Sequence, residues 1–266
     1  MSKAEQYLDN LTAQGEILFT SQQLRQALNC SESSALNILN RLKNKKEITS
    51  PSKGYYLILT PEFREQGCLP ADYFIDDLMR HWKKDYYVCL LSAALYHGAA
   101  HQQPQVFQVM IPDKKKPIRC GHIYITFIQN NQCAQTPIQQ IKTRTGYMKV
   151  STPEVTAMDL LKYVRQSGGI SRVATVLDEL AESLSPDALV ELAGHSEEHT
   201  WVHRLGFLLD ELGYHKLADV LYRSLDKEPV DIIPLAPYSP ITGVPRDKKW
   251  RIAINATVES DLDDTH

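Results

Sequence analysis

The chain has 266 residues, of which 43% are hydrophobic and 23% charged, and its formal net charge is −3. This length exceeds the usual single-domain size of roughly 100 to 150 residues, and the apolar fraction excludes a disordered chain, so we expect more than one packed unit. No apolar run reaches the ~18 residues of a membrane span, and residues 1–10 lack a signal-peptide core. We therefore expect a cytoplasmic protein with no membrane partner. Five cysteines without a CxxC pair indicate reduced thiols.

Charge is distributed unevenly along the chain. Residues 1–60 have a net charge of +2, residues 61–79 of −4, residues 80–150 of +8 and residues 151–266 of −9. Opposite charges on separate parts of a chain suit a protein with one polyanionic partner and a separate protein-binding surface. Alternatively, the basic and acidic parts pack against each other, and charge counts leave both interpretations open.

The first sixty residues predict three helices followed by a hairpin. Serine and threonine caps and the spacing of apolar residues place helices at about 2–14, 22–29 and 32–45. Two short strand-like runs, 47–50 and 55–59, surround a turn-forming Pro-Ser-Lys-Gly sequence. This order is typical of a winged helix-turn-helix, and we predict such a DNA-binding domain over residues 1–66.

The third helix has two faces. Ala35, Leu36, Leu39 and Leu42 fall within one arc, and short polar and basic residues fall on the opposite arc. A helix that enters the major groove needs this division, although an ordinary amphipathic surface helix also has it. The basic residues nearby and the hairpin after the helix favour DNA binding. We expect Ser34, Asn37 and Arg41, with Ser33 beside them, at base edges, and Arg25, Lys43, Lys45 and Lys53 on phosphates.

The remaining residues, 67–266, predict a second domain. A helix at 72–82 and a buried helix at 86–96 precede strands within about 105–150, among them 106–111 and 118–128. Helices dominate about 153–225. The predicted fold class is therefore α+β: an N-terminal winged helix-turn-helix, then a mixed α/β domain that is mostly helical toward the C-terminus.

The densest basic run lies between two of the expected strands. If it forms a solvated hairpin tip, solubility alone explains it, and no aromatic residues are interleaved for base stacking. The alternative is an auxiliary nucleic-acid contact or a docking loop for an acidic partner. We take the run as the candidate partner surface of the second domain; it consists of Lys114, Lys115, Lys116 and Arg119.

The sequence contains little that indicates catalysis. It has no P-loop, GxGxxG, GxSxG or HExxH motif. His195, His199 and His203 recur every four residues, as metal ligands on one helix face would, but no further ligand completes a site. Cys120 and His122 alternate in an expected strand and should face the same side. We predict no catalytic residue, no metal site, no cofactor and no enzyme activity.

Four long segments carry more specific motifs. Residues 86–112 begin YYVCLLSAALYHG, residues 145–182 begin TGYMKVSTPEV, residues 203–213 read HRLGFLLDELG, and residues 248–262 begin KKWRIAINATV. Together with the winged helix, they resemble the AbiEi family of antitoxins from type IV toxin-antitoxin systems, over nearly the whole chain.

The resemblance implies an antitoxin that is also an autorepressor in abortive infection, a form of phage defence. Its winged helix is expected to bind operator DNA with inverted repeats, and its C-terminal domain to counteract a cognate nucleotidyltransferase-like toxin. Whether the two proteins touch is left open, as is the oligomeric state. The alternative is a winged-helix transcriptional regulator with a ligand-sensing or nuclease-like second domain; no Asp followed by Glu-x-Lys is readable, which argues against a nuclease.

Overall fold

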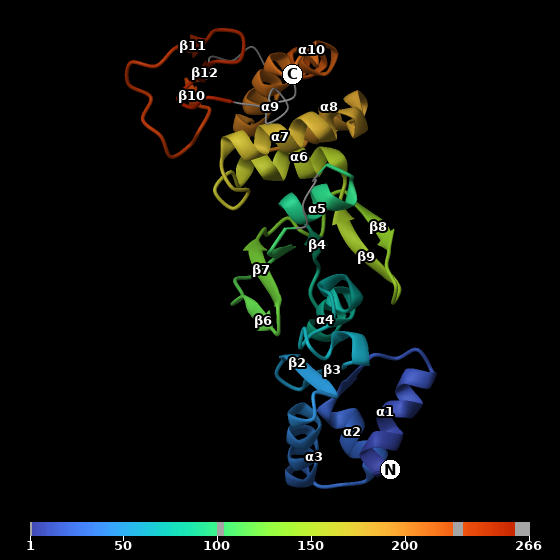
Figure 1. The fold of residues 1–266 in the computed structure, drawn as a ribbon. Helices are drawn as coiled ribbons and strands as arrows, with labels where there is room; N and C mark the ends of the chain where they lie inside the picture. The colour runs from blue at the N-terminus through green and yellow to red at the C-terminus, as the bar shows by residue number, and fades with distance from the viewer. Residues whose placement is uncertain (1, 100–103, 226–230, 259–266) are drawn as a thin grey trace. The chain divides into compact units, whose positions relative to one another are not determined.

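The computed structural model describes residues 2–99, 104–225 and 231–258 (Figure 1). Its contacts divide the chain into two units. The first comprises residues 1–87, 105–134 and 140–149, and the second comprises residues 88–104, 135–139 and 150–266. The boundary predicted after residue 66 falls within the first unit. The assignment of DNA binding to residues 1–66 and of antitoxin function to residues 67–266 remains a prediction.

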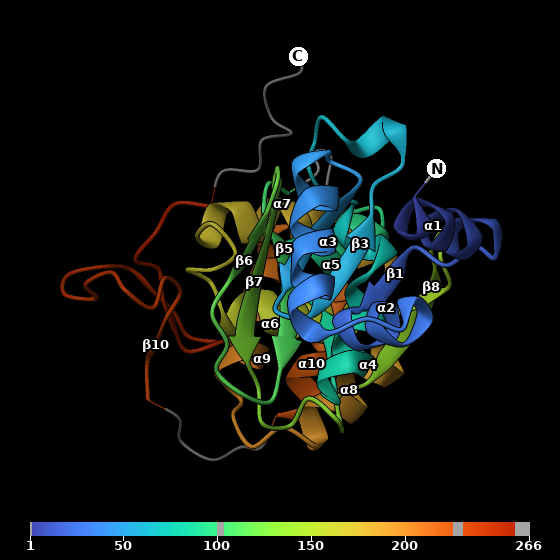
Figure 2. The ribbon, with the colours of Figure 1, turned by 90° about the horizontal axis from the view of Figure 1, so that it is seen from below.

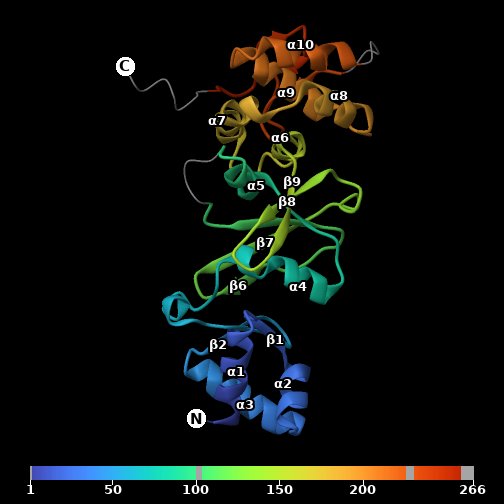
Figure 3. The same cartoon turned by 90° about the vertical axis from the view of Figure 1, so that its right-hand side faces the viewer.

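The first unit begins with the predicted helices and hairpin (Figure 3). Thr20 accepts the backbone N–H of Gln23, and Ser31 accepts that of Ser34, so the side chains expected to start the second and third helices do so. Asn29 ends the second helix in the left-handed conformation, as expected near that residue. The elements are α1 (Lys3–Ala13), β1 (Leu18–Thr20), α2 (Ser21–Leu28), α3 (Glu32–Asn44), β2 (Ile48–Ser52) and β3 (Tyr55–Ile58).

Strand β1 was not expected. It pairs antiparallel with β3, which also pairs with β2, so the sheet order is β1-β3-β2. Three residues are too few for a periodic signal, and only the pairing with β3 identifies this segment as a strand. The resulting order is α1-β1-α2-α3-β2-β3, which is the expected three helices and hairpin with β1 added to the sheet.

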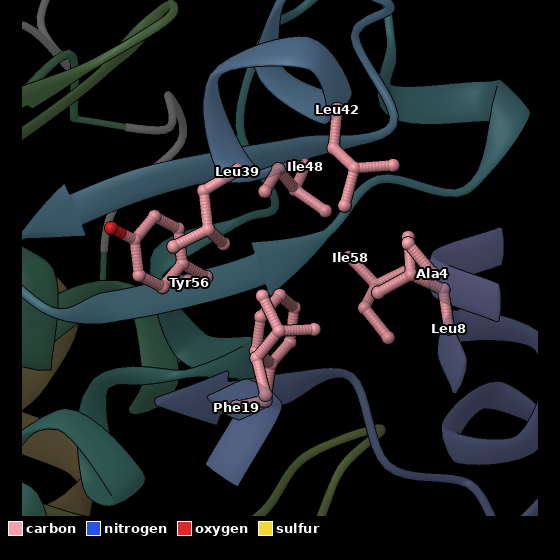
Figure 4. Packing of buried hydrophobic residues seen from close by; sticks show 9 residues of the cluster. Ala4, Leu8, Phe19, Leu39, Leu42, Ile48, Tyr56 and Ile58 are labelled. Carbon is pink, nitrogen blue, oxygen red and sulfur yellow. The ribbon is translucent and has the colours of Figure 1, made fainter. Parts of the chain in front are cut away.

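The helices and this sheet enclose one small apolar core (Figure 4). Phe19 and Leu24 are fully buried, and the ring of Phe19 stacks on that of Tyr56 with centroids 5.5 Å apart. Leu39 and Leu42 bury the inner face of α3 in the same cluster. Burial of each such side chain contributes roughly 1.5–3 kcal/mol to the stability of the fold. This burial holds α3 against the rest of the core cluster.

The first unit continues through short helical turns at Pro61–Phe63 and Ala71–Tyr73 into α4 (Ile75–Trp82) and a larger sheet. Strand β5 (Phe107–Ile111) runs parallel to β7 (Ile123–Gln129), and β6 (Ile118–Cys120) pairs antiparallel with β7, as Figure 2 shows. The sheet order is β6-β7-β5-β4-β9-β8, with β4 (Tyr87–Val88), β8 (Ile138–Lys142) and β9 (Tyr147–Ser151).

Three expectations for this region were wrong. The single strand expected at 118–128 is a hairpin, β6–β7, that turns at Gly121 and His122. The basic segment before it is therefore not the tip of a β5–β6 hairpin, because β5 pairs with β7. The apolar segment 86–96 was expected to be one helix, but it forms strand β4 before α5 (Leu90–Tyr96). A short apolar run does not distinguish a strand from a helix.

The second unit contains the helices expected between residues 153 and 225. They are α6 (Pro153–Lys162), α7 (Ile170–Leu180) with the helical turn Ala181–Ser183, α8 (Pro186–Gly194), α9 (Thr200–Glu211) and α10 (His215–Ser224). A short sheet of order β10-β12-β11 follows, from β10 (Ile233–Pro234), β11 (Arg246–Asp247) and β12 (Ile252–Ala253). The fold is mixed α and β, with helices dominating toward the C-terminus, as predicted. Among the described helices, none has the length and apolar character that a membrane crossing requires.

Candidate nucleic-acid interface

The solvent side of α3 is a continuous stripe of mostly polar side chains. Residues 33, 36, 37, 40, 41 and 44 are spaced by three or four positions, so they share one face of the helix, and each is exposed. The opposite stripe, which includes Ala35, Ile38, Leu39 and Leu42, packs on or near the small core. We call the exposed set, which is Ser33, Leu36, Asn37, Asn40, Arg41 and Asn44, the α3 stripe.

One member of the stripe corrects the sequence interpretation. Leu36 was assigned to the apolar arc, but 51% of its surface is exposed. Ile38, which that arc left out, packs against the core instead. The spacing of Ala35, Ile38, Leu39 and Leu42 already completes an apolar stripe, which could have identified Leu36 as an outsider. Asn40 was also missed. An exposed leucine beside amides matches the needs of base-edge reading, because thymine presents a methyl group.

The serine hydroxyls at the start of α3 are linked to one another. The Oγ atom of Ser31 lies 3.0 Å from that of Ser33 and donates to that of Ser34 at 2.9 Å. Ser31 also accepts the backbone N–H of Ser34 at 3.2 Å. Ser33 and Ser34 are both exposed in the first turn of α3. The cap therefore holds two hydroxyls in place at the N-terminus of α3, directly after the three-residue turn from α2.

The predicted phosphate-binding cations fall into two groups. Arg25 on α2 is exposed, as is Lys53 in the turn between β2 and β3, which we call the wing turn. Arg41 of the α3 stripe is exposed too, and none of the three makes an ion pair within the part of the chain that the structure describes. Lys43 is exposed and its Nζ atom lies 5.1 Å from the ring centroid of Tyr56. Gly54, with φ of 76°, forms the tight wing turn that presents Lys53.

Lys45 differs from the other cations because it is already paired. Its Nζ atom lies 2.8 Å from Oε1 of Glu5 and 3.8 Å from Oε1 of Glu47. The hydrogen bond from Lys45 is the main reason that the pKa of Glu5 falls to about 2. A cation held by two carboxylates neutralises a phosphate less effectively than a free one.

The basic run after β5 is divided in the same way. Lys114 and Lys116 are exposed, whereas Lys115 is half-buried with its Nζ atom 3.2 Å from the ring centroid of Trp82. Burial, and then the nearby charge of Lys84, lowers the pKa of Lys115. Arg119 lies over the ring of Tyr124 at 4.7 Å. The structure thus supplies aromatic neighbours that the sequence order did not reveal.

The three histidines of the series do not lie on one helix. His195 caps the end of α8, His199 precedes α9, and His203 lies within α9. The Nδ1 atom of His203 is 2.8 Å from the carbonyl oxygen of Trp250, and that of His195 is 2.8 Å from the carbonyl oxygen of Glu191. Within the described residues, no three His, Cys, Asp or Glu side chains gather to hold a metal ion.

The expected pairing of Cys120 and His122 on one strand face was also wrong. Cys120 is buried at the end of β6, whereas His122 is exposed in the turn that follows. Because Gly121 adopts a left-handed φ of 54°, the alternation of a strand ends there.

In the second unit, two of the quoted motifs pack against each other. A Cβ atom on Gly206 would lie 2.1 Å from the indole of Trp250, so the ring rests directly on the backbone of α9. Trp250 Nε1 donates to Oδ2 of Asp210 at 2.7 Å, and Lys249 Nζ lies 2.8 Å from the same oxygen. Together with the His203 contact, these interactions attach the segment 249–250 to α9. We call this set, His203, Gly206, Asp210, Lys249 and Trp250, the tryptophan clamp.

Arg204, the neighbour of His203, is also used inside the fold. Its Nε atom donates to the carbonyl oxygen of Pro234 at 3.0 Å, and Nη1 donates to that of Leu161 at 3.3 Å. The side chain is buried, and burial lowers its pKa. Two of the motif's polar residues therefore hold backbone carbonyls and do not form a surface for a partner.

Comparisons with known proteins agree with this fold. The chain is similar to the RV2827C protein from Mycobacterium tuberculosis, whose crystal structure matches with a TM-score of 0.68 at 17% identity, over 94% of this chain and 90% of that one. At this identity, the likeness shows the fold alone. No curated protein matches the chain. Residues 86–211 match the family model of the AbiEi antitoxin C-terminal domain. The resemblance seen in the motifs is thereby confirmed, and residues 86–211 form an AbiEi antitoxin C-terminal domain.

Proposed function

We propose that this antitoxin also represses its own operon, and that the α3 stripe reads the operator. The observation that carries the proposal is an exposed set of amide, hydroxyl and guanidinium groups on α3, supported from behind by a buried core. Asn37 and Asn40 have the bidentate amides that recognise adenine, and Arg41 has the guanidinium that recognises guanine. Leu36 supplies an apolar contact for a thymine methyl.

Phosphate contacts come from outside the stripe. Arg25, Lys43 and Lys53 lie on α2, α3 and the wing turn, and no carboxylate is paired with them among the described residues. Such contacts fix the register of a winged helix on the duplex but carry no sequence information. Lys45 contributes less, because it is held by Glu5 and Glu47.

The second part of the proposal concerns the partner. We infer that the AbiEi domain counteracts a cognate nucleotidyltransferase-like toxin in the cytoplasm, as a type IV system does, and that the chain is not an enzyme. The exposed cations Lys114 and Lys116 are candidates for a surface that meets an acidic partner. The motif residues of the tryptophan clamp serve the stability of the domain.

A separation-of-function experiment tests both parts. Cells that carry the toxin gene under an inducible promoter and a reporter under the operon's own promoter receive either the wild-type chain or Asn37→Ala/Arg41→Ala. The wild type should rescue growth and repress the reporter, whereas the variant should rescue growth without repression. Full repression by the variant would remove the role of the α3 stripe, and failure of the wild type to rescue would remove the antitoxin assignment.

Matched substitutions test the partner surface. Lys114→Ala/Lys116→Ala should reduce rescue and retain repression if these exposed cations meet the partner. Lys142→Ala, an exposed cation on β8, is the control and should retain both. Equal rescue by all three chains would exclude the surface.

A further inference from the structure

Two cysteines meet where the segment after the wing crosses strand β6. Cys68 is fully buried, and Cys120 is only 5% exposed. The main chains beside them are joined, because the backbone N–H of His122 donates to the carbonyl oxygen of Gln66 at 2.9 Å. The two cysteines are 52 positions apart in the sequence, so neither their spacing nor a motif indicates that they are neighbours.

Two glycines permit the close approach. A Cβ atom on Gly121 would lie 2.0 Å from the carbonyl oxygen of Gln66, and one on Gly67 would lie 3.2 Å from Cα of Gly121. Both glycines have positive φ, of 72° at Gly67 and 54° at Gly121. Each is the immediate neighbour of one cysteine, so the backbone crossing brings the two thiols together.

The thiols interact with each other and with the wing. Cys68 and Cys120 are close enough that each is the largest influence on the pKa of the other. Oγ1 of Thr49, on β2, lies 3.2 Å from Sγ of Cys120. The contact with Cys68, aided by Thr49 and by the charge of Lys43, lowers the pKa of Cys120 to about 7 despite its burial. The same contact, together with burial, raises the pKa of Cys68. One thiol is thus set to ionise first.

We propose that Cys68 and Cys120 form an oxidation site at which a hydroperoxide, such as hydrogen peroxide, closes an intrachain disulfide. This site does not depend on the proposed DNA binding. In the first step, the Cys120 thiolate attacks one peroxide oxygen; the O–O bond breaks, hydroxide leaves and Cys120 becomes a sulfenic acid. In the second step, Cys68 attacks the Cys120 sulfur, the S–O bond breaks and water leaves. Overall, two thiols and one hydrogen peroxide give one disulfide and two waters.

The first step favours the second. The raised pKa of Cys68 comes mainly from its contact with Cys120, and that contact changes when the thiolate becomes a neutral sulfenic acid. Cys68 can then lose its proton more easily and act as the resolving thiol. The product ties the segment after the wing to β6, and β6 meets wing strand β2 at Thr49.

The test uses the full-length chain. Reduced protein receives equimolar hydrogen peroxide, free thiols are alkylated, and a digest without reductant is analysed by mass spectrometry. The expected result is the loss of two alkylatable thiols, a mass lower by about 2 Da, and one cross-linked peptide pair containing Cys68 and Cys120, all reversed by dithiothreitol. Because the disulfide constrains the unfolded chain, Tm should rise by about 5 °C.

Variants identify the roles of the two thiols. Cys68→Ser should give no cross-link and should leave a sulfenic acid on Cys120 that dimedone traps. Cys133→Ser is the control and should cross-link as the wild type does; the Cys133 thiol contacts the carbonyl oxygen of Met110 instead. If Cys68→Ser fails to fold, the wild-type digest still decides. Oxidation at half-exposed Cys30 while Cys68 and Cys120 remain alkylatable would overturn the proposal.

Discussion

On α3 of the first unit, Asn37 and Arg41 are exposed. On α9 of the second unit, His203 and Arg204 are buried against backbone carbonyls. Both helices carry polar residues among leucines, and both have a buried face. The difference is that the polar side chains of α3 face solvent, whereas those of α9 form hydrogen bonds within the fold. Polar residues on a helix therefore indicate a binding surface only if their side chains are not already hydrogen-bonded inside the fold.

The comparison predicts its largest effect at Gly206. Gly206→Ala places a methyl group 2.1 Å from the indole of Trp250, which neither the helix backbone nor the ring can accommodate without moving. We expect a loss of about 3 kcal/mol in the free energy of unfolding, measured by chemical denaturation. Gly194→Ala is the matched control, because no atom lies within 4 Å of its Cβ position, and it should be neutral or slightly stabilising. Equal stability of the two variants would contradict the tryptophan clamp.

The next effect is on DNA affinity. Arg41→Ala should weaken operator binding by about 1–3 kcal/mol and leave binding to random DNA nearly unchanged, because a base-edge contact acts only at its own base. Lys53→Ala should weaken binding to both DNAs equally, because a phosphate contact is independent of sequence. Fluorescence anisotropy on the two duplexes measures both. Equal losses on operator and random DNA for both variants would exclude the assigned roles.

A smaller effect distinguishes the free cations from the paired one. With Arg25, Lys43 and Lys53 on phosphates, the slope of log affinity against log salt should be about −2.7, whereas four contacts including Lys45 would give about −3.6. Lys43→Ala should reduce the steepness by about 0.9, and Lys45→Ala should change it little. A clear loss of slope in Lys45→Ala would show that the ion pair opens for DNA.

The smallest effect is local to Glu5. Its pKa of about 2 lies below the ordinary value of 4.5. The Lys45 pair therefore stabilises the fold above about pH 4.5 and loses this effect as the pH falls toward 2. Lys45→Ala should return the pKa of Glu5 toward its ordinary range, measured by NMR titration of the side-chain carboxyl carbon. A Glu5 pKa that is the same in both chains would exclude the pair in solution.

Local signals explain what could be predicted. Thr20 and Ser31 cap α2 and α3 with their own side chains, and Asn29 tolerates the left-handed conformation that ends α2, so both helices were placed correctly from sequence. Helical spacing is also a local property of the sequence, and it correctly predicted that Asn37 and Arg41 point outward. The strands within about 105–150 were predicted from runs of β-branched residues. The helices within about 153–225 were predicted from capped amphipathic segments.

Long-range pairing explains what could not be predicted. The partner of Lys45 is Glu5, forty residues away, and nothing near Lys45 in the sequence indicates it. The parallel pairing of β5 with β7 depends on tertiary context, so the basic run was placed on a hairpin tip. Gly206 and Trp250 each stand in a recognisable motif, but their contact appears only when the fold brings the two motifs together.

Anisotropy titration of the full-length chain on the DNA upstream of its own operon tests the central claim most directly. The measured quantity is the ratio of affinities for this DNA and for a scrambled duplex of equal length at one salt concentration. The account predicts a ratio of about 10³ or more, which Asn37→Ala/Arg41→Ala reduces by at least tenfold. Equal affinity of the wild-type chain for both duplexes would contradict a DNA-reading role for the α3 stripe.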